Sequence, residues 1–182
     1  MRVTQAPLEG LLVLEPKIFG DSRGFFLDTY SRERYRAAGI TEELLQDNLS
    51  FSGRGVLRGL HFQNPAPQGK LVYVLQGAVF DVAVDLRRSS PTFGEWYGTA
   101  LTDENKKQLW IPPGFAHGFC VTSETALFTY KCSAYYAPET EHTIRYDDPD
   151  IGIAWPVSNP QLSDKDRVAP NLKEMDSAVL FE

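Results

Sequence analysis

Apolar and polar residues alternate along much of the chain from Lys70 onward, the pattern of β-strands with one strongly apolar face. In residues 78–86 one face carries four large apolar side chains, Phe80, Val82, Val84 and Leu86. The other face mixes apolar and acidic side chains, Val79, Asp81, Ala83 and Asp85. Gly77 separates this segment from a second apolar run at residues 71–75, so we expect a hairpin turn there.

The same pattern and its Gly and Pro boundaries predict further strands at residues 11–16, 24–30, 56–62, 94–101, 107–111, 118–122, 126–134 and 144–146. Helices are few. We expect one from Ser31 through Ala38 that stops at Gly39, a single turn starting at Thr41, and a short helix or turn after Ser163. So many short strands predict an all-β sandwich or barrel, organised as a single domain over residues 1–182.

Composition narrows the function. The net charge of −6 and the lack of a basic stripe argue against nucleic-acid binding, although a small anionic ligand needs only a few local Arg and Lys residues. No segment approaches the roughly 20 apolar residues of a membrane span, and the first ten residues lack the apolar run of a signal peptide. We therefore expect a cytoplasmic protein, in which Cys120 and Cys132 are buried, reduced thiols.

The candidate chemistry starts with three histidines, His61, His117 and His142. Strand alternation in LRGLHFQ, residues 57–63, places His61 and Gln63 on one side and Arg58 on the other, unless the backbone bulges at Gly59. A metal site beside His61 would need further His or carboxylate ligands. Gln63 and Lys70 occur instead, and a cation opposes metal binding, so we expect no metal.

Ten ordered motifs resemble one protein family, the dTDP-4-dehydrorhamnose 3,5-epimerases, and the resemblance extends over about residues 11–170. They are residues 19–26, 46–50, 57–63, 68–70, 80–85, 90–94, 109–119, 130–131, 135–138 and 151–156. The resemblance implies a cupin-type jelly-roll β-barrel with a few short helices. It also implies a homodimer, the absence of metal or other cofactor, and a dTDP-linked 4-keto-6-deoxysugar as substrate.

The implied reaction inverts carbons 3 and 5 of the sugar through enolate intermediates. It requires a base on one face of the sugar, an acid on the opposite face and a positive group near the ketone oxygen. By resemblance His61 is the base and Asp166 orients it, while Tyr130 is the acid and Lys70 stabilises the enolate. A histidine suits the base because its ordinary pKa of about 6.5 leaves it largely neutral at pH 7.

The resemblance also implies the residues that bind the nucleotide sugar: Arg23, Asp28, Gln46, Asn48, Arg58, Lys70, His117, Tyr136, Glu141 and Lys165. Guanidinium groups such as those of Arg23 and Arg58 suit a diphosphate, and Tyr136 is expected to stack on the thymine ring. Asp28 stands where many family members carry Glu, so its reach is shorter. His142 fits no motif and is expected at the surface.

Simpler interpretations remain open from the residues alone. His61 and Tyr130 also suit ordinary strand positions, Lys70 a solvated loop, and Asp166 a capping box. Three other functions remain: an epimerase that inverts only C3 or C5, a 3,4-ketoisomerase of such a sugar, or a cupin that binds sugars without catalysis. For the homodimer, the apolar residues 10–14 suggest a strand that could join a partner's sheet.

Overall fold

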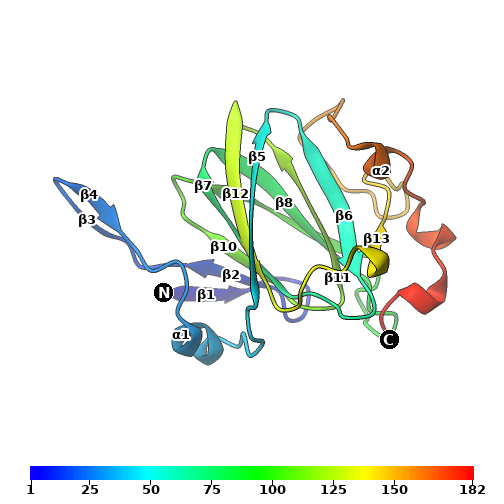
Figure 1. Cartoon of the computed structure of the whole chain (residues 1–182), viewed down its shortest axis with the longest axis horizontal. Helices are drawn as coiled ribbons and strands as arrows, with labels where there is room; N and C mark the ends of the chain where they lie inside the picture. The colour runs from blue at the N-terminus through cyan, green and yellow to red at the C-terminus, as the bar shows by residue number, and fades with distance from the viewer.

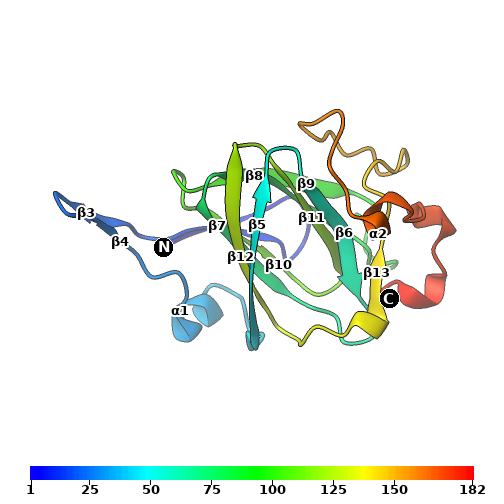
Figure 2. The same ribbon diagram turned by 45° about the horizontal axis from the view of Figure 1, so that its top comes forward.

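The computed structural model describes all 182 residues, which form two antiparallel sheets curved around a common interior (Figures 1 and 2). The six-stranded sheet has the order β1 (Arg2–Gln5), β2 (Leu12–Glu15), β10 (Gln108–Ile111), β7 (Lys70–Gln76), β12 (Thr125–Cys132) and β5 (Gln46–Gly53). The five-stranded sheet has the order β13 (Glu141–Thr143), β6 (Leu57–Gln63), β11 (Phe115–Val121), β8 (Ala78–Asp85) and β9 (Trp96–Thr102).

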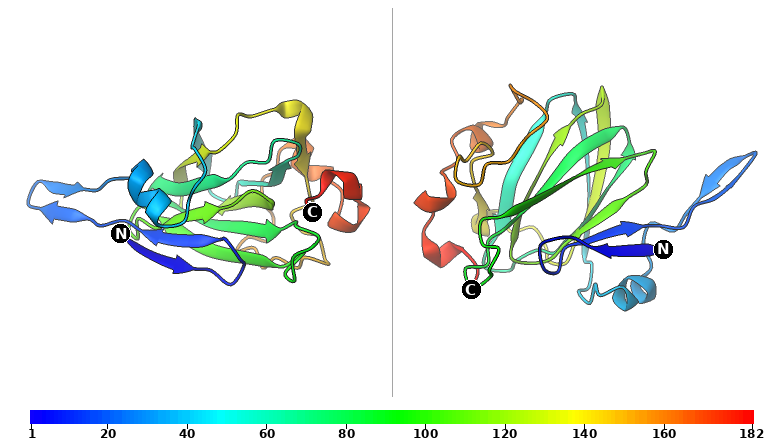
Figure 3. Two further views of the ribbon diagram at one scale, coloured as in Figure 1. Left: turned by 90° about the horizontal axis from the view of Figure 1, so that it is seen from below. Right: turned by 180° about the vertical axis from the view of Figure 1, so that it is seen from behind.

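The remaining elements lie outside this barrel. A hairpin of β3 (Phe19–Asp21) and β4 (Gly24–Phe26), here called the arm, projects away from it, and α1 (Arg32–Ala37) follows (Figure 1). The C-terminal part, with α2 (Asp164–Arg167) and the 3-10 helices η1 (Pro138–Thr140), η2 (Leu172–Glu174) and η3 (Ser177–Val179), lies along one side (Figure 3). No helix combines the length and apolar character that crossing a membrane requires.

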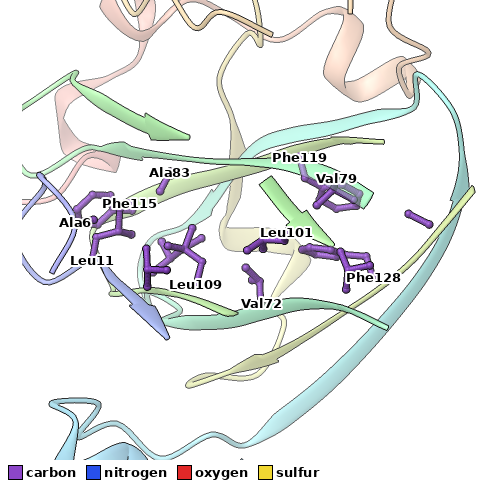
Figure 4. Packing of buried hydrophobic residues seen from close by; sticks show 14 of the residues in the cluster. Ala6, Leu11, Val72, Val79, Ala83, Leu101, Leu109, Phe115, Phe119 and Phe128 are labelled. Carbon is purple, nitrogen blue, oxygen red and sulfur yellow. The ribbon is translucent and has the colours of Figure 1, made fainter. Parts of the chain in front are cut away.

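The main core fills the space between the sheets, where side chains from both meet (Figure 4). Val72 from one sheet and Val79 and Ala83 from the other are fully buried there, beside the stacked rings of Phe119 and Phe128. The opposite face of β8 is also buried, because the C-terminal segment covers it. The acidic face predicted for residues 78–86 is therefore the inner one, and Asp81 is fully buried on it.

The structure confirms most of the predicted elements. Eight of the predicted β segments correspond to β2, β6, β7, β8, β9, β10, β11 and β12. Gly77 forms the predicted turn with φ +82°, and α1 begins after Ser31 and is followed by Gly39 with φ +104°, although the Ser31 side chain makes no capping hydrogen bond. At α2 the Ser163 hydroxyl accepts a hydrogen bond from the backbone N–H of Asp166, as its capping pattern predicts.

Other predictions of elements are wrong. The predicted strand at residues 24–30 ends at Phe26, because no strand lies beside the rest of it. Residues 144–146 are not a strand: β13 ends at Thr143, and of the three only Ile144 still exchanges backbone hydrogen bonds with β6, through Leu60. No helical turn forms at Thr41. Four strands were not predicted: β1, β3, β5 and β13. In β5 the polar Asn48 and Ser50 face inward while Leu49 and Phe51 face outward, the reverse of an ordinary barrel strand.

Candidate active site

A cavity of about 660 Å³ opens at one end of the barrel, between the two sheets and α2. It is lined by seven of the residues named from the sequence: Arg58, His61, Lys70, His117, Tyr130, Lys165 and Asp166. They come from β6, β7, β11, β12 and α2, so the fold brings together segments up to 108 residues apart (166 minus 58). The four proposed reaction residues are all in this set.

A β-bulge in β6 explains why Arg58 and His61 share the cavity. His61 pairs with His117 and Arg58 with Phe119, so two residues of β6 lie opposite the single Gly118. The extra residue turns Arg58 to the side of His61, as expected if the backbone bulges at Gly59. Gly59 has φ +132°, and a Cβ there would lie 2.5 Å from the Gly118 Cα, so only glycine fits.

His61 and Asp166 form a short, partly buried pair. The His61 Nε2 lies 2.6 Å from Oδ1 of Asp166, whose side chain is only 2% exposed. Burial raises the pKa of Asp166, but the hydrogen bond and charge interaction with His61 outweigh it and bring that pKa below its ordinary value. Asp166 therefore takes part in the Ser163 cap of α2 only by donating its backbone N–H, while its carboxylate bonds His61.

Lys70 and Tyr130 lie on the neighbouring strands β7 and β12. Burial lowers the pKa of the Lys70 ammonium and raises the pKa of the Tyr130 hydroxyl to about 12. Tyr130 consequently keeps its proton at neutral pH, the form in which a phenol can donate it. The ring packs edge-on to His117 and against Phe128, which fixes its place in the cavity.

Two lining residues, His117 and Arg58, are held by polar residues behind the lining that were not predicted as site residues. The His117 Nε2 lies 3.0 Å from Oδ2 of Asp81, and burial lowers the pKa of this histidine. Ser52 accepts hydrogen bonds from Nε and Nη2 of Arg58 at 3.2 and 3.1 Å. Asp81 could have been predicted from the sequence as a carboxylate inside an otherwise apolar strand. Ser52 could have been predicted from the polar residues that recur at every second position in residues 46–52.

Four more predicted binding residues gather at the rim beside Lys165: Gln46, Asn48, Tyr136 and Glu141. The Glu141 Oε2 accepts hydrogen bonds from the Tyr136 hydroxyl at 3.0 Å and from Nζ of Lys165 at 2.7 Å. The Gln46 side chain accepts the backbone N–H of Tyr136 at 2.9 Å and donates to Oδ1 of Asn48 at 2.9 Å. These contacts connect the rim directly to the lining of the cavity.

Arg23 and Asp28 do not reach this cavity. Arg23 lies at the tip of the arm, which projects away from the barrel, and pairs with Asp21 (Figure 1). Asp28 pairs with Arg34 of α1 at 2.6 Å.

The prediction of a surface position for His142 is wrong: its ring is partly buried 5.2 Å from that of Phe62, because β13 lies beside β6. No three His, Cys, Asp or Glu side chains cluster closely enough to hold a metal ion.

Comparisons with known proteins agree with these features. A family model described as dTDP-4-dehydrorhamnose 3,5-epimerase matches residues 5–174. The chain is 54% identical over 168 residues to the epimerase of that name from Shigella flexneri, covering 91% of this chain and 93% of the relative. It is 51% identical over 185 residues to that from Salmonella typhimurium, covering both proteins completely.

Solved structures extend this agreement to the fold. The dTDP-6-deoxy-D-glucose-3,5-epimerase of Legionella pneumophila, solved in complex with dTDP-4-keto-L-rhamnose, has a TM-score of 0.97 and 51% identity, covering 100% of this chain and 97% of that one. The predicted all-β cupin-type fold is thereby confirmed. With this match over nearly its whole length, the chain belongs to the dTDP-4-dehydrorhamnose 3,5-epimerase family.

Proposed function

We propose that this protein epimerises dTDP-4-dehydro-6-deoxy-D-glucose at C3 and C5 and produces dTDP-4-dehydro-L-rhamnose. The observation that carries the proposal is the 2.6 Å pair of His61 and Asp166 in one cavity with Lys70 and Tyr130, in a chain of this family. A histidine base, a neutral phenol and a buried cation are the three groups that enolisation and reprotonation beside a ketone require.

The base acts through the ring nitrogen that Asp166 leaves free. Because Nε2 of His61 donates its proton to the carboxylate, the neutral ring has its lone pair on Nδ1. Nδ1 removes the proton from the carbon beside the ketone, and the electron pair moves onto the ketone oxygen as an enolate. Asp166 stabilises the imidazolium that forms, and the Lys70 ammonium stabilises the enolate oxygen.

Inversion then needs a proton from the opposite face of the ring. Tyr130 supplies it to the enolate carbon, and the electron pair returns from oxygen to re-form the ketone. His61 then releases its extra proton to solvent and the Tyr130 phenolate takes a proton up from solvent, after which the same two steps at the second carbon complete the reaction. No step requires a metal or an organic cofactor, so we expect the reaction to proceed without either.

The nucleotide would occupy the rim that adjoins these groups. Arg58, held by Ser52, and Lys165 present positive charge to a diphosphate, and the half-exposed ring of Tyr136 offers a face for the base. A Bacillus anthracis epimerase, 44% identical with a TM-score of 0.92, was solved with TDP and PPi bound. That complex supports a nucleoside diphosphate as the anchoring part of the substrate.

Residues 10–14 are not the dimer contact that the sequence suggested. That segment leads into β2, which already lies between β1 and β10 with Leu11 and Leu14 fully buried, so it cannot join a partner. The outer face of β5 and β7 is open instead, where Leu49, Phe51 and Leu75 are 62%, 66% and 46% exposed. We expect this face to pack against a second copy.

The arm would make the dimer necessary for substrate binding. Its Phe25 and Phe26 are 59% and 66% exposed, and it carries Arg23 away from the cavity of its own chain. We expect it to lie along the partner subunit and to bring Arg23 and Asp28 to the partner's rim. Action in the cytoplasm, the expected place for the two free, buried thiols Cys120 and Cys132, remains a prediction.

A single-carbon epimerase is the second candidate, because the dTDP-4-dehydrorhamnose 3-epimerase of Streptomyces niveus is 43% identical over 183 residues. Proton NMR of the product from dTDP-4-keto-6-deoxyglucose in deuterated water separates the possibilities. Deuterium with inversion at both C3 and C5 is the expected result. Change at one carbon identifies the single-carbon enzyme, movement of the carbonyl to C3 a ketoisomerase, and no exchange at all a binding protein.

A further inference from the structure

Gln63 lies two residues after His61 on β6 but does not line the cavity. Its side chain is buried, at 3% exposed, and makes three hydrogen bonds, all with backbone groups. Its Nε2 donates to the carbonyl oxygens of Ala66 at 2.6 Å and Tyr135 at 3.1 Å, and its Oε1 accepts the N–H of Ala137 at 2.9 Å. A side chain at the end of the catalytic strand thus fixes a distant segment of backbone.

The bonded groups flank Tyr136 on both sides. Gln63 holds the carbonyl before this residue and the N–H after it, and Gln46 accepts the N–H of Tyr136 itself. Tyr136 itself is 51% exposed, and its side chain makes one hydrogen bond, which its hydroxyl donates to Glu141. The place of this ring is therefore set through its backbone, and Gln63 supplies two of the three bonds.

These contacts belong to a continuous network of hydrogen bonds around the rim. Glu141 pairs with Gln63 between β13 and β6, and its carboxylate holds both the Tyr136 hydroxyl and Lys165. Lys165 precedes Asp166 in the chain, and Asp166 bonds His61, so the network reaches the base. The Tyr136 ring and His61 are therefore held at a fixed separation.

We propose that Gln63 is a positioning residue for nucleotide recognition, which sets the Tyr136 ring at a fixed place relative to His61. The proposal rests on the proposed function and deepens it. A ring already held in place can stack on the base without first being ordered, so the hydrogen bonds of Gln63 should contribute mainly to binding. The amide suits this task because it both donates and accepts, which neither a carboxylate nor an apolar side chain does.

The test removes the hydrogen bonds of Gln63 and keeps its bulk. Gln63→Met has a side chain of similar length without amide groups, and Gln5→Met is the matched control, since Gln5 also donates to a backbone carbonyl but lies on β1. Each full-length protein is titrated with dTDP and, separately, with inorganic pyrophosphate, which has no base to stack. Circular dichroism and thermal unfolding establish that each variant is folded.

We expect the Kd of Gln63→Met for dTDP to rise about tenfold, within the contribution of one base stacked on an aromatic ring. Its Kd for pyrophosphate should change by less than about twofold, because Arg58 and Lys165 are untouched. In turnover, KM should rise by about the same factor as the Kd for dTDP, with kcat within about threefold. Gln5→Met should match the wild type in every measurement.

An unchanged Kd for dTDP in folded Gln63→Met would overturn the proposal, and so would equal weakening of dTDP and pyrophosphate, which indicates general disruption. If Gln63→Met does not fold, Gln68→Met replaces it, since Gln68 holds the Ala134 carbonyl of the same segment at 2.9 Å. It should weaken dTDP about threefold and spare pyrophosphate; no selective effect would overturn the proposal. A wild-type protein that does not bind dTDP would refute the proposed function itself.

Discussion

At the scale of single residues, the base and its partner occupy different positions in the reaction. In the proposed mechanism His61 transfers the proton at Nδ1, whereas Asp166 orients the ring through its contact with Nε2. We expect His61→Asn to abolish deuterium incorporation at both C3 and C5, a loss of at least the roughly 10²–10⁴-fold of general-base removal. Asp166→Asn should lose less. Exchange at the wild-type rate in His61→Asn, measured by proton NMR, would remove His61 from the mechanism.

Loss of the acid should have a different effect. In Tyr130→Phe the hydroxyl is absent but the ring still packs against Phe128 and His117. His61 still removes a proton and returns a deuteron to the same face. Substrate recovered from deuterated water should carry deuterium with its original configuration, while inverted product falls roughly 10²-fold or more. Inversion at the wild-type rate would make Tyr130 a structural tyrosine only.

If Lys70 stabilises the enolate as proposed, the loss of its charge should set the alkaline limit of activity. Burial lowers the pKa of its ammonium, so the positive charge is lost at a lower pH than that of an exposed lysine. We expect kcat to fall on the alkaline side, and Lys70→Met to lose about 10²–10³-fold at pH 7, as when one donor to an oxyanion is removed. Lys70→Arg should retain some activity and shift the alkaline fall upward in a pH profile. An identical profile would contradict this role.

At the scale of elements, the turn after β8 depends on one buried carboxylate. Asp85 accepts hydrogen bonds from Arg87, Ser90 and Thr92. Burial raises its pKa, but these bonds outweigh burial and bring the pKa to about 2, against an ordinary value of 3.8. The folded pKa is the lower one, so the stabilisation is complete above about pH 4 and is lost as the pH falls toward 2.

Asp85→Asn should therefore lower the free energy of unfolding by about 2 kcal/mol at pH 7, the amount that corresponds to this pKa difference. The difference between wild type and variant should shrink as the pH is lowered from 4 to 2. Urea unfolding at several pH values measures both quantities. A difference that stays constant over this range would show that the turn does not depend on the ionised carboxylate.

At the scale of the whole molecule, the arm predicts complementation between two defective subunits. Homodimers of His61→Asn and of Arg23→Ala should each turn over poorly. In a mixed dimer with the arm crossing over, one site combines the intact His61 of one chain with the intact Arg23 of the other. Activity should then rise after subunit exchange, and light scattering should give twice the 20.4 kDa chain mass. A mass of 20.4 kDa, or no gain on mixing, would contradict the crossed arm.

The sequence by itself determined the local features. Alternation in residues 78–86 and the turn at Gly77 follow from side-chain period and backbone freedom, which depend on near neighbours alone. The ten motifs were sufficient to name the family, and the resemblance named seven of the residues that line the cavity. Each motif is a short stretch of chain that can be recognised without the fold.

Tertiary structure decided what depends on packing partners. Whether Arg58 joins His61 was open until the bulge at Gly59 formed against Gly118, and β5 was missed because its polar side faces the cavity. The contact of His61 with Asp166 spans 105 residues, and Arg23 lies outside the cavity because its arm leaves the barrel. The alternation of side chains along a strand is fixed by the strand itself. The segments that cover each face of the strand come from elsewhere in the chain, so only the folded protein determines which face forms the site.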